Sequence, residues 1–220
     1  MPTKETKMET TILKTADLFA PGGLRKAFYA LVLGGVFSLF DLELFAALCV
    51  AFAIATLYWY YQPKKFVPNL ENSAVASPVD GKVIAIEEIE SQKYGYRLCI
   101  EGSYFDKGAL YAPVRADSCV FSLRRGSRLK ENASLFEILN ERLEVTFFVN
   151  DLEVKCEHTL KRSIFDLHVD SFKKMYEVGA YYGFALNAQT YIYLPKSFRL
   201  NVHVGSKLHA RQNILGYFSS

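Results

Sequence analysis

The sequence predicts a mainly β protein, a β-sandwich or barrel-like domain preceded by an N-terminal α-helical membrane hairpin. Two apolar stretches with an acidic turn between them fill residues 27–61, and they raise the hydrophobic content of the chain to 50%. From residue 74 onward, short runs rich in Val, Ile, Tyr and Phe alternate with turn residues, a pattern typical of strands. We therefore expect an N-terminal segment (1–26), a hairpin (27–61), a linker (62–73) and a β domain (74–220).

The two apolar stretches differ in length. "FYALVLGGVFSLF" (28–40) is short, whereas "LELFAALCVAFAIATLYWYY" (42–61) is apolar throughout except for Glu43. A helix needs about 20 residues to span the hydrocarbon of a bilayer. The second stretch is therefore expected to cross, while the first either crosses or only dips into the bilayer. A buried helical hairpin of a soluble protein is the alternative. Pro63 and Pro68 are expected to end the second helix and begin the linker.

The distribution of charge predicts the orientation of the hairpin. Basic residues flank it on both sides: Lys4, Lys7, Lys14, Arg25 and Lys26 before it, and Lys64 and Lys65 after it. Asp41 and Glu43 lie at its turn. Because loops rich in Lys and Arg stay in the cytoplasm, both ends of the chain are expected there and the turn outside. The aromatic cluster "YWYY" (58–61) suits the membrane interface. We expect an inner (cytoplasmic) membrane protein whose β domain faces the cytoplasm.

Overall charge and cysteine spacing argue against two other classes of function. A net charge of +3 over 220 residues, without a basic run interleaved with aromatics, does not suggest nucleic acid binding. The four cysteines (Cys49, Cys99, Cys119 and Cys156) form no CxxC pair, so neither a metal site nor a disulfide framework is expected. They are expected to be small buried hydrophobic residues.

The β domain is expected to consist of strands joined by tight turns, with one short helix. The helix is expected within "LKENASLFEILNER" (129–142), with Asn132 or Ser134 as its N-cap. "SPVDGKVIAI" near the start of the domain and "VGSKLHARQNILGYF" at its end each place a glycine-containing turn beside an alternating strand. Such hairpins are typical of a β-sandwich.

Several of these segments together resemble the short, membrane-anchored bacterial and archaeal-type phosphatidylserine decarboxylases. The most specific matches are "QPKKFVPNLENSAVASPVDGKV" and "GSRLKENASLFEILNER". Weaker matches are "TLKRSIF", "YIYLP" and the closing "VGSKLHARQNILGYF". The resemblance extends from the apolar hairpin to the carboxyl end, and the order and spacing of the matches carry it.

The resemblance implies a lyase that uses a pyruvoyl cofactor made from its own chain. In the family, a serine hydroxyl attacks the carbonyl of the preceding glycine, and β-elimination from the resulting ester leaves a pyruvoyl group at the new amino terminus. This group forms an imine with the amine of the lipid and accepts the electrons left when CO₂ departs. An aspartate and a histidine assist the serine during processing.

Only one of these residues is kept in the matching positions. Asp80 matches the aspartate, although an Asp before a Gly is also a common turn residue that caps its own backbone. Gly108, within "FDKGALYAPVRAD", stands where the resemblance implies the histidine. Asn187 and Ala188, counted back from "YIYLP", stand where it implies the glycine and the serine. Because an alanine methyl offers no oxygen, we expect no pyruvoyl group.

Two other segments contain residues of the types that are missing, a histidine and a glycine–serine pair. His168 in "DLHVD" lies in a later strand, and Gly205–Ser206 lies in a carboxyl-terminal turn, so neither is expected to replace the base or the cleavage pair. His158, His203 and His209 show no spacing for a metal site or a catalytic triad and are interpreted as surface or strand residues.

Three functions remain open at this point. The first is a homologue that does not process itself, binds membrane phospholipid or regulates phospholipid metabolism, and associates with itself or with a true decarboxylase. Exposed strand edges would suit such association. The second is an active phosphatidylserine decarboxylase that cuts itself at an unidentified site and makes phosphatidylethanolamine. The third is a membrane adaptor unrelated to lipid.

Overall fold

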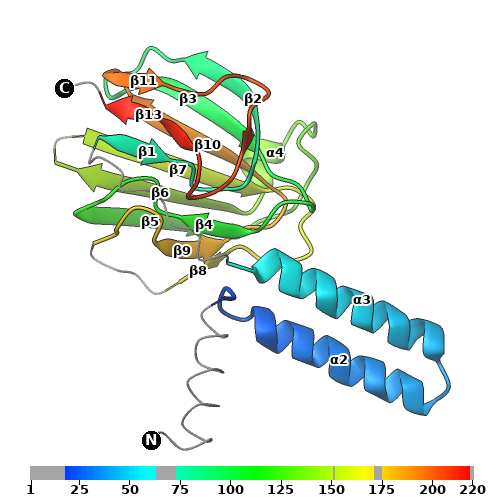
Figure 1. Ribbon diagram of the computed structural model, residues 1–220. Helices are drawn as coiled ribbons and strands as arrows, with labels where there is room; N and C mark the ends of the chain where they lie inside the picture. Colours follow the sequence, from blue (N-terminus) through cyan, green and yellow to red (C-terminus); the bar gives the residue numbers. More distant parts are fainter. Residues whose placement is uncertain (1–17, 63–72, 151, 171–174, 219–220) are drawn as a thin grey trace, which may run out of the picture. The chain divides into compact units, whose positions relative to one another are not determined.

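The computed structural model describes residues 18–62, 73–150, 152–170 and 175–218 (Figure 1). The chain divides into two compact units, Met1–Lys64 and Lys65–Ser220, and the boundary falls within the linker predicted at 62–73. Most of the predicted N-terminal segment, and the prolines and lysines of the linker, lie outside the described residues. Each unit is described by itself below.

The first unit is a pair of helices, α2 (Gly23–Leu39) and α3 (Glu43–Tyr60). Small residues let the helices approach, since a β-carbon on Gly34 would lie only 3.1 Å from Cβ of Cys49. At the open end of the hairpin, Nζ of Lys26 donates a hydrogen bond of 2.6 Å to the hydroxyl of Tyr60. The main chain before α2 also pairs with the main chain after α3, where the amide of Ala20 bonds to the carbonyl of Tyr60 at 2.8 Å.

Most large side chains of this hairpin face outward. Leu39 is 83% exposed and Leu44 is 72% exposed, and many others of both helices are more than two-fifths exposed. Among the described residues, α3 is the one helix that is long and apolar enough to cross a membrane. An apolar surface of this kind is stable in lipid and unfavourable in water. The exposure therefore favours the membrane hairpin over a hairpin buried in a soluble core.

The second unit is built from three antiparallel sheets. Its strands are β1 (Ala74–Ala76), β2 (Gly81–Glu88), β3 (Tyr94–Glu101), β4 (Ala109–Tyr111), β5 (Ser118–Arg124), β6 (Arg142–Val149), β7 (Leu152–Leu160), β8 (His168–Val169), β9 (Tyr181–Phe184), β10 (Ala188–Pro195), β11 (Phe198–Leu200), β12 (Lys207–Leu208) and β13 (Ile214–Phe218). The large sheet has the order β12-β2-β3-β10-β7-β6-β5, and the small sheets have the orders β1-β13-β11 and β4-β9-β8.

The two glycine-containing segments at the ends of the domain are partners in the structure. β12 pairs with β2, with Leu208 opposite Gly81, and β1 pairs with β13. The carbonyl of Ser77 also accepts a bond of 3.0 Å from the amide of Arg211. The similar patterns in "SPVDGKV" and "VGSKLHARQNILGYF" therefore mark strands that meet, which closes the domain by joining its first and last elements.

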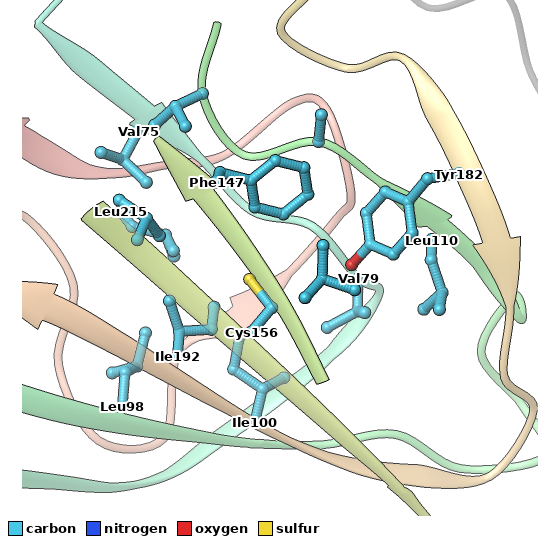
Figure 2. Packing of buried hydrophobic residues seen from close by; sticks show 14 of the residues in the cluster. Val75, Val79, Leu98, Ile100, Leu110, Phe147, Cys156, Tyr182, Ile192 and Leu215 are labelled. Atoms are coloured by element: carbon cyan, nitrogen blue, oxygen red, sulfur yellow. The ribbon is translucent and has the colours of Figure 1, made fainter. Parts of the chain in front are cut away.

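All three sheets contribute to one hydrophobic core (Figure 2). Val75 and Leu215 come from one small sheet, Leu110 and Tyr182 from the other, and Ile192 from the centre of the large sheet. Along the strands of the large sheet, alternate residues enter this core, as the burial pattern of β6 shows. The predicted β-sandwich type of domain, preceded by a helical hairpin, is thus confirmed.

Three local expectations need correction. The predicted helix is a single turn, α4 (Phe136–Leu139); its N-cap is Leu135, not Asn132 or Ser134, and no side chain caps it. The strand β9 was not expected, because "YYGF" is too short to show alternation. The cysteines are all free, with Cys99 and Cys156 buried as expected, but Cys49 and Cys119 are only half-buried.

Candidate functional site

The sequence-predicted site residues gather at one end of the large sheet. β3 ends at Glu101, β7 ends at Leu160 and β10 begins at Ala188, and these ends are adjacent because Ala188 pairs with Leu160 and Gln189 pairs with Glu101. The start of β2 lies there too, since Lys82 pairs with Glu101. The segments that leave these strand ends therefore surround Asp80 and the Asn187–Ala188 bond.

The Asn187–Ala188 bond lies at a sharp bend of the main chain. Asn187 has a φ of 53°, a left-handed conformation that glycine adopts freely and asparagine tolerates best among other residues. Its side-chain amide donates to the carbonyl of Lys161 at 2.6 Å, and the amide of Lys161 donates to the carbonyl of Asn187 at 2.9 Å. The backbone at position 187 thus has a shape that suits a glycine.

The side chain of Ala188 is part of the hydrophobic core. The residue is 5% exposed, and its carbonyl accepts a bond of 2.9 Å from the amide of Gly102. A β-carbon on Gly102 would lie 3.1 Å from the carbonyl oxygen of Ala188 and 3.7 Å from that of Asp80. Asp80 and Ala188 are therefore close neighbours across Gly102.

Asp80 has a structural partner, but not the one expected for a turn residue. Its Oδ1 accepts a hydrogen bond of 2.6 Å from the amide of Ala210, 130 residues further along the chain. It therefore joins the first turn of the domain to the last, instead of capping its own backbone. The buried Tyr111 lies nearby, where burial raises the pKa of its hydroxyl to about 12, Arg211 opposes that rise and Asp80 adds to it.

Gly108 has no room for a larger side chain. Its carbonyl accepts a bond of 2.7 Å from the amide of Ala185, which brings it close to the segment that leads into Asn187. A β-carbon at this position would lie 2.6 Å from the ring of Phe184, a residue of β9 that is 1% exposed. The aromatic ring thus lies against the face of Gly108 from which an imidazole would have to extend. Nearby Asp106 closes a turn by accepting from the hydroxyl of Ser103 at 2.6 Å.

The histidines lie where the sequence placed them, with one unexpected environment. His168 is an exposed residue of β8, and His203 and His209 are exposed in the final loops. His158 is a fully buried residue of β7, with Nδ1 2.9 Å from the hydroxyl of Thr190 and Nε2 2.6 Å from that of Tyr182. Burial lowers its pKa to about 3, so it is neutral. Gly205, the first residue of the Gly205–Ser206 pair that resembles a cleavage site, has a φ of 95° in the turn between β11 and β12.

Sequence reasoning missed an ion pair beside the Asn187–Ala188 bond. Nζ of Lys161 lies 2.7 Å from Oε1 of Glu101, and the side chain of Lys161 is only 7% exposed whereas that of Glu101 is 39% exposed. The lysine directly follows Leu160, the last residue of β7, so its place in the sequence gave no sign that it would be buried. It supports the same bend that Asn187 forms.

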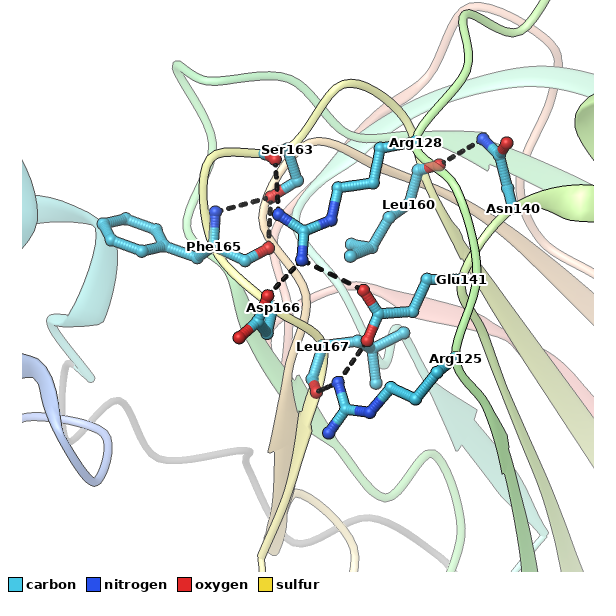
Figure 3. A network of polar contacts seen from close by, with 9 residues as sticks. All are labelled: Arg125, Arg128, Asn140, Glu141, Leu160, Ser163, Phe165, Asp166 and Leu167. Carbon is cyan, nitrogen blue, oxygen red and sulfur yellow. Dashed lines mark hydrogen bonds and ion pairs between the residues drawn. The ribbon is translucent and has the colours of Figure 1, made fainter.

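The motif "GSRLKENASLFEILNER" has a structural explanation (Figure 3). Asn140, which is fully buried, bonds to both main-chain groups of Leu129 at 2.9 Å. It also donates to the carbonyl of Leu160 at 2.7 Å, the bond drawn in Figure 3. The carboxylate of Glu141, 2% exposed, pairs with Arg125 and Arg128. The motif thus fixes the loop between β5 and β6 to the end of β7, next to Lys161.

Comparison with known proteins gives a distant relationship. Over 177 residues, the chain is 26% identical to the phosphatidylserine decarboxylase proenzyme of Desulfotalea psychrophila, and the match covers 73% of this chain and 78% of that protein. No family model matches the sequence, and no solved structure matches it. The chain is therefore distantly related to phosphatidylserine decarboxylase.

Proposed function

Starting from this distant relationship, we propose that the chain is a membrane-anchored homologue of phosphatidylserine decarboxylase that does not form a pyruvoyl group. In this proposal it binds phospholipid or regulates phospholipid metabolism at the cytoplasmic membrane, and it does not decarboxylate lipid. The methyl side chain of Ala188 carries the proposal, because this position matches the serine that would supply both the attacking and the departing oxygen.

The geometry around position 188 supports this interpretation. Asn187 keeps a left-handed φ of 53°, so the bend expected at a glycine–serine pair is present without the hydroxyl. The methyl of Ala188 packs in the hydrophobic core instead of facing a base. A serine there would have to bury its hydroxyl among apolar groups unless a partner were supplied. The site is therefore organised around an apolar residue.

The environment of Gly108 supports it independently. In the related enzymes the resemblance places a histidine at this position, and here the ring of Phe184 lies 2.6 Å from where a β-carbon would be. Two different elements, β9 and β10, thus carry apolar side chains where processing needs a base and a nucleophile. Family resemblance does not transfer an activity to a site whose reactive groups are replaced.

Analysis of the purified full chain would test the proposal. Denaturing electrophoresis and intact mass should give one chain of 25.0 kDa, and borohydride or hydrazine labelling should detect no pyruvoyl carbonyl. Assays with phosphatidylserine vesicles should release no CO₂, while phospholipid should copurify with the chain. Two fragments, one of them blocked at its amino terminus by a pyruvoyl group, would overturn the proposal in favour of an active decarboxylase that is cut at another position.

The partner is proposed from the same relationship. A homologue without its own cofactor can act by pairing with a functional decarboxylase or with a second copy of itself. Crosslinking in native membranes, followed by mass spectrometry, would identify such a partner. Recovery of proteins unrelated to phospholipid metabolism, together with the absence of bound lipid, would support a membrane adaptor instead.

A further inference from the structure

Four large aliphatic side chains are exposed at the end of the large sheet that carries the candidate site. Ile138 is 62% exposed, Ile164 is 51%, Leu135 is 46% and Leu139 is 44%. They belong to the segments that follow β5 and β7, and both of these strands end beside the start of β6. We call these four residues the apolar rim. In water they leave unfavourable apolar surface in contact with solvent.

A buried side chain and hydrogen bonds hold the segments of the apolar rim in place. Phe136, between Leu135 and Ile138, is 4% exposed and anchors the turn α4 in the domain. The two segments are also bonded to each other, because a guanidinium nitrogen of Arg128 donates to the carbonyl of Ser163 at 3.0 Å. A second bond of 3.2 Å joins the amide of Arg162 to the carbonyl of Arg128. The rim is therefore a preformed surface that needs little ordering on binding.

Charged residues flank the apolar rim. Arg124 is exposed at the end of β5, and Arg125, Lys130 and Arg162 are exposed in the two segments, together with the acidic Glu131, Glu137 and Asp166. The excess of positive charge is small, so apolar contact would supply most of the binding free energy. Burying an aliphatic side chain is favourable in proportion to the apolar area that it removes from water. Four partly exposed ones, with basic residues at the level of the phosphates, suit an anionic phospholipid surface.

The length of the chain keeps the β domain near such a surface. Thirteen residues, from Tyr61 to Ser73, separate the last residue of α3 from the first of β1. Fully extended, they reach about 45 Å. If α3 spans the bilayer, the domain is therefore always within a short distance of the headgroups, which makes lipid the partner at highest local concentration.

We propose that the apolar rim inserts into the headgroup layer of the membrane that anchors the chain. Insertion would place the end of the sheet that carries Asp80 and Ala188 against the lipid. Interfacial apolar residues typically enter the bilayer by about 5–10 Å. This inference rests on the membrane attachment in the proposed function, and it adds which face of the β domain contacts the lipid.

The single tryptophan of the chain allows a direct test. In a Trp59→Phe background, Ile138→Trp and Ile164→Trp introduce reporters into the rim. Met175→Trp is the matched control: Met175 is 56% exposed, but it precedes Tyr176, which pairs with Ala116 beside the opposite end of β5. The full chains are reconstituted into vesicles of equal parts phosphatidylcholine and phosphatidylglycerol, with or without brominated acyl chains.

The two rim reporters should emit at shorter wavelength than the control and be quenched severalfold more by the brominated lipid. Equal, weak quenching at positions 138, 164 and 175 would overturn the inference. Shielding of the rim reporters that disappears on diluting the protein in lipid, without quenching, would overturn it in favour of a second copy of the chain.

Flotation of the same vesicles separates failure of this inference from failure of the proposed function. A chain that floats, stays uncut and shows no rim quenching overturns only the rim. A chain that does not float overturns membrane attachment and the rim with it. Fragments with a pyruvoyl carbonyl would overturn the proposed loss of processing and leave the quenching result valid.

Discussion

At the scale of single residues, the proposed loss of self-processing leads to a prediction about the ring of Phe184. We expect Gly108→His, Asn187→Gly and Ala188→Ser combined in one chain to leave the protein uncut, because the histidine has no space beside this ring. Adding Phe184→Ala should open that space and allow cleavage before position 188, releasing the last 33 residues. Electrophoresis and amino-terminal analysis of the fragments would detect the cut.

The control separates the effect of the introduced serine from that of the introduced histidine. Phe184→Ala with Ala188→Ser, but without the histidine, should remain uncut because no base is present. Loss of the buried Phe184 ring by itself is expected to cost about 3–5 kcal/mol, so circular dichroism must show that each variant is folded. Cleavage of the triple variant that retains Phe184 would contradict the packing argument.

His158 should make stability depend on pH. Burial lowers its pKa to about 3 in the folded chain, whereas an unfolded chain has the ordinary value of 6.5. Between these values the unfolded chain binds a proton that the folded chain does not. The contribution is therefore fully present above pH 6.5 and is lost as the pH falls toward 3, at about 1.4 kcal/mol per pH unit.

Urea unfolding of the full chain in a non-ionic detergent would measure this effect. Wild type should lose about 2 kcal/mol more than His158→Gln between pH 7 and pH 5, because glutamine binds no proton. At pH 7, Thr190→Val provides the comparison for loss of a hydrogen-bonding partner of the imidazole without loss of the titrating group. Parallel pH curves for wild type and His158→Gln would show that the imidazole is accessible to protons.

Sequence and structure agree at some site residues and differ at others. The left-handed bend at position 187 follows from a resemblance to a glycine, and asparagine is the substitute that this conformation accepts. The role of Asp80 was not predictable, because its partner Ala210 is 130 residues away. Neither was that of Phe184, since a buried aromatic in a short strand is indistinguishable in sequence from any other core residue.

At the scale of elements, the segment from Gly126 to Arg142 depends on one side chain. Asn140 satisfies the amide and carbonyl of Leu129 and the carbonyl of Leu160 in a fully buried position. Asn140→Ala should therefore reduce the free energy of unfolding by about 2–4 kcal/mol, because main-chain groups would stay buried without partners. Urea unfolding would measure the loss.

Asn132 offers the matched control in the same loop. It is exposed, so Asn132→Ala should change the free energy of unfolding by no more than about 0.5 kcal/mol. Equal effects of the two substitutions would show that the hydrogen bonds of Asn140 do not hold the loop. A selective loss should also be accompanied by faster proteolysis in the segment between β5 and β6.

The elements themselves were predictable wherever alternation extended over several residues. β6 and β7 follow directly from "LEVTFFVNDLEVKCE", and β10 from "QTYIYLP". The helix α4 was overestimated because helix-forming residues continue through "LKENASLFEILNER", although bonds from Asn140 hold part of that segment as a loop. Pairing was the least predictable feature, since β12 and β2 meet only through contacts between the two ends of the domain.

At the scale of the whole molecule, the length and flanking charges of the hairpin predict how the chain crosses a membrane. α2 and α3 have 17 and 18 residues, which gives helices of about 26 and 27 Å, close to the roughly 30 Å of a hydrocarbon core. Asp41 lies between the helices, and basic residues lie at both outer ends of the pair. By length and composition α3 alone is a candidate span among the described residues, but α2 is only one residue shorter and packs against it. We therefore predict that both helices cross as a pair, with the turn outside and the β domain in the cytoplasm.

Cysteine labelling in intact bacterial cells would test this topology. In the full chain, Asp41→Cys should react with a membrane-impermeant maleimide added outside, whereas Gln212→Cys, in the exposed final loop of the β domain, should react only after permeabilisation. The wild-type chain, which has four free cysteines of its own, sets the background. If the flanking lysines do not govern insertion, the labelling pattern should be reversed, with position 212 reacting in intact cells and position 41 only after permeabilisation. If position 41 instead reacts only after permeabilisation, like position 212, the hairpin dips into the bilayer without crossing, because a turn that emerges on the far side must be accessible there.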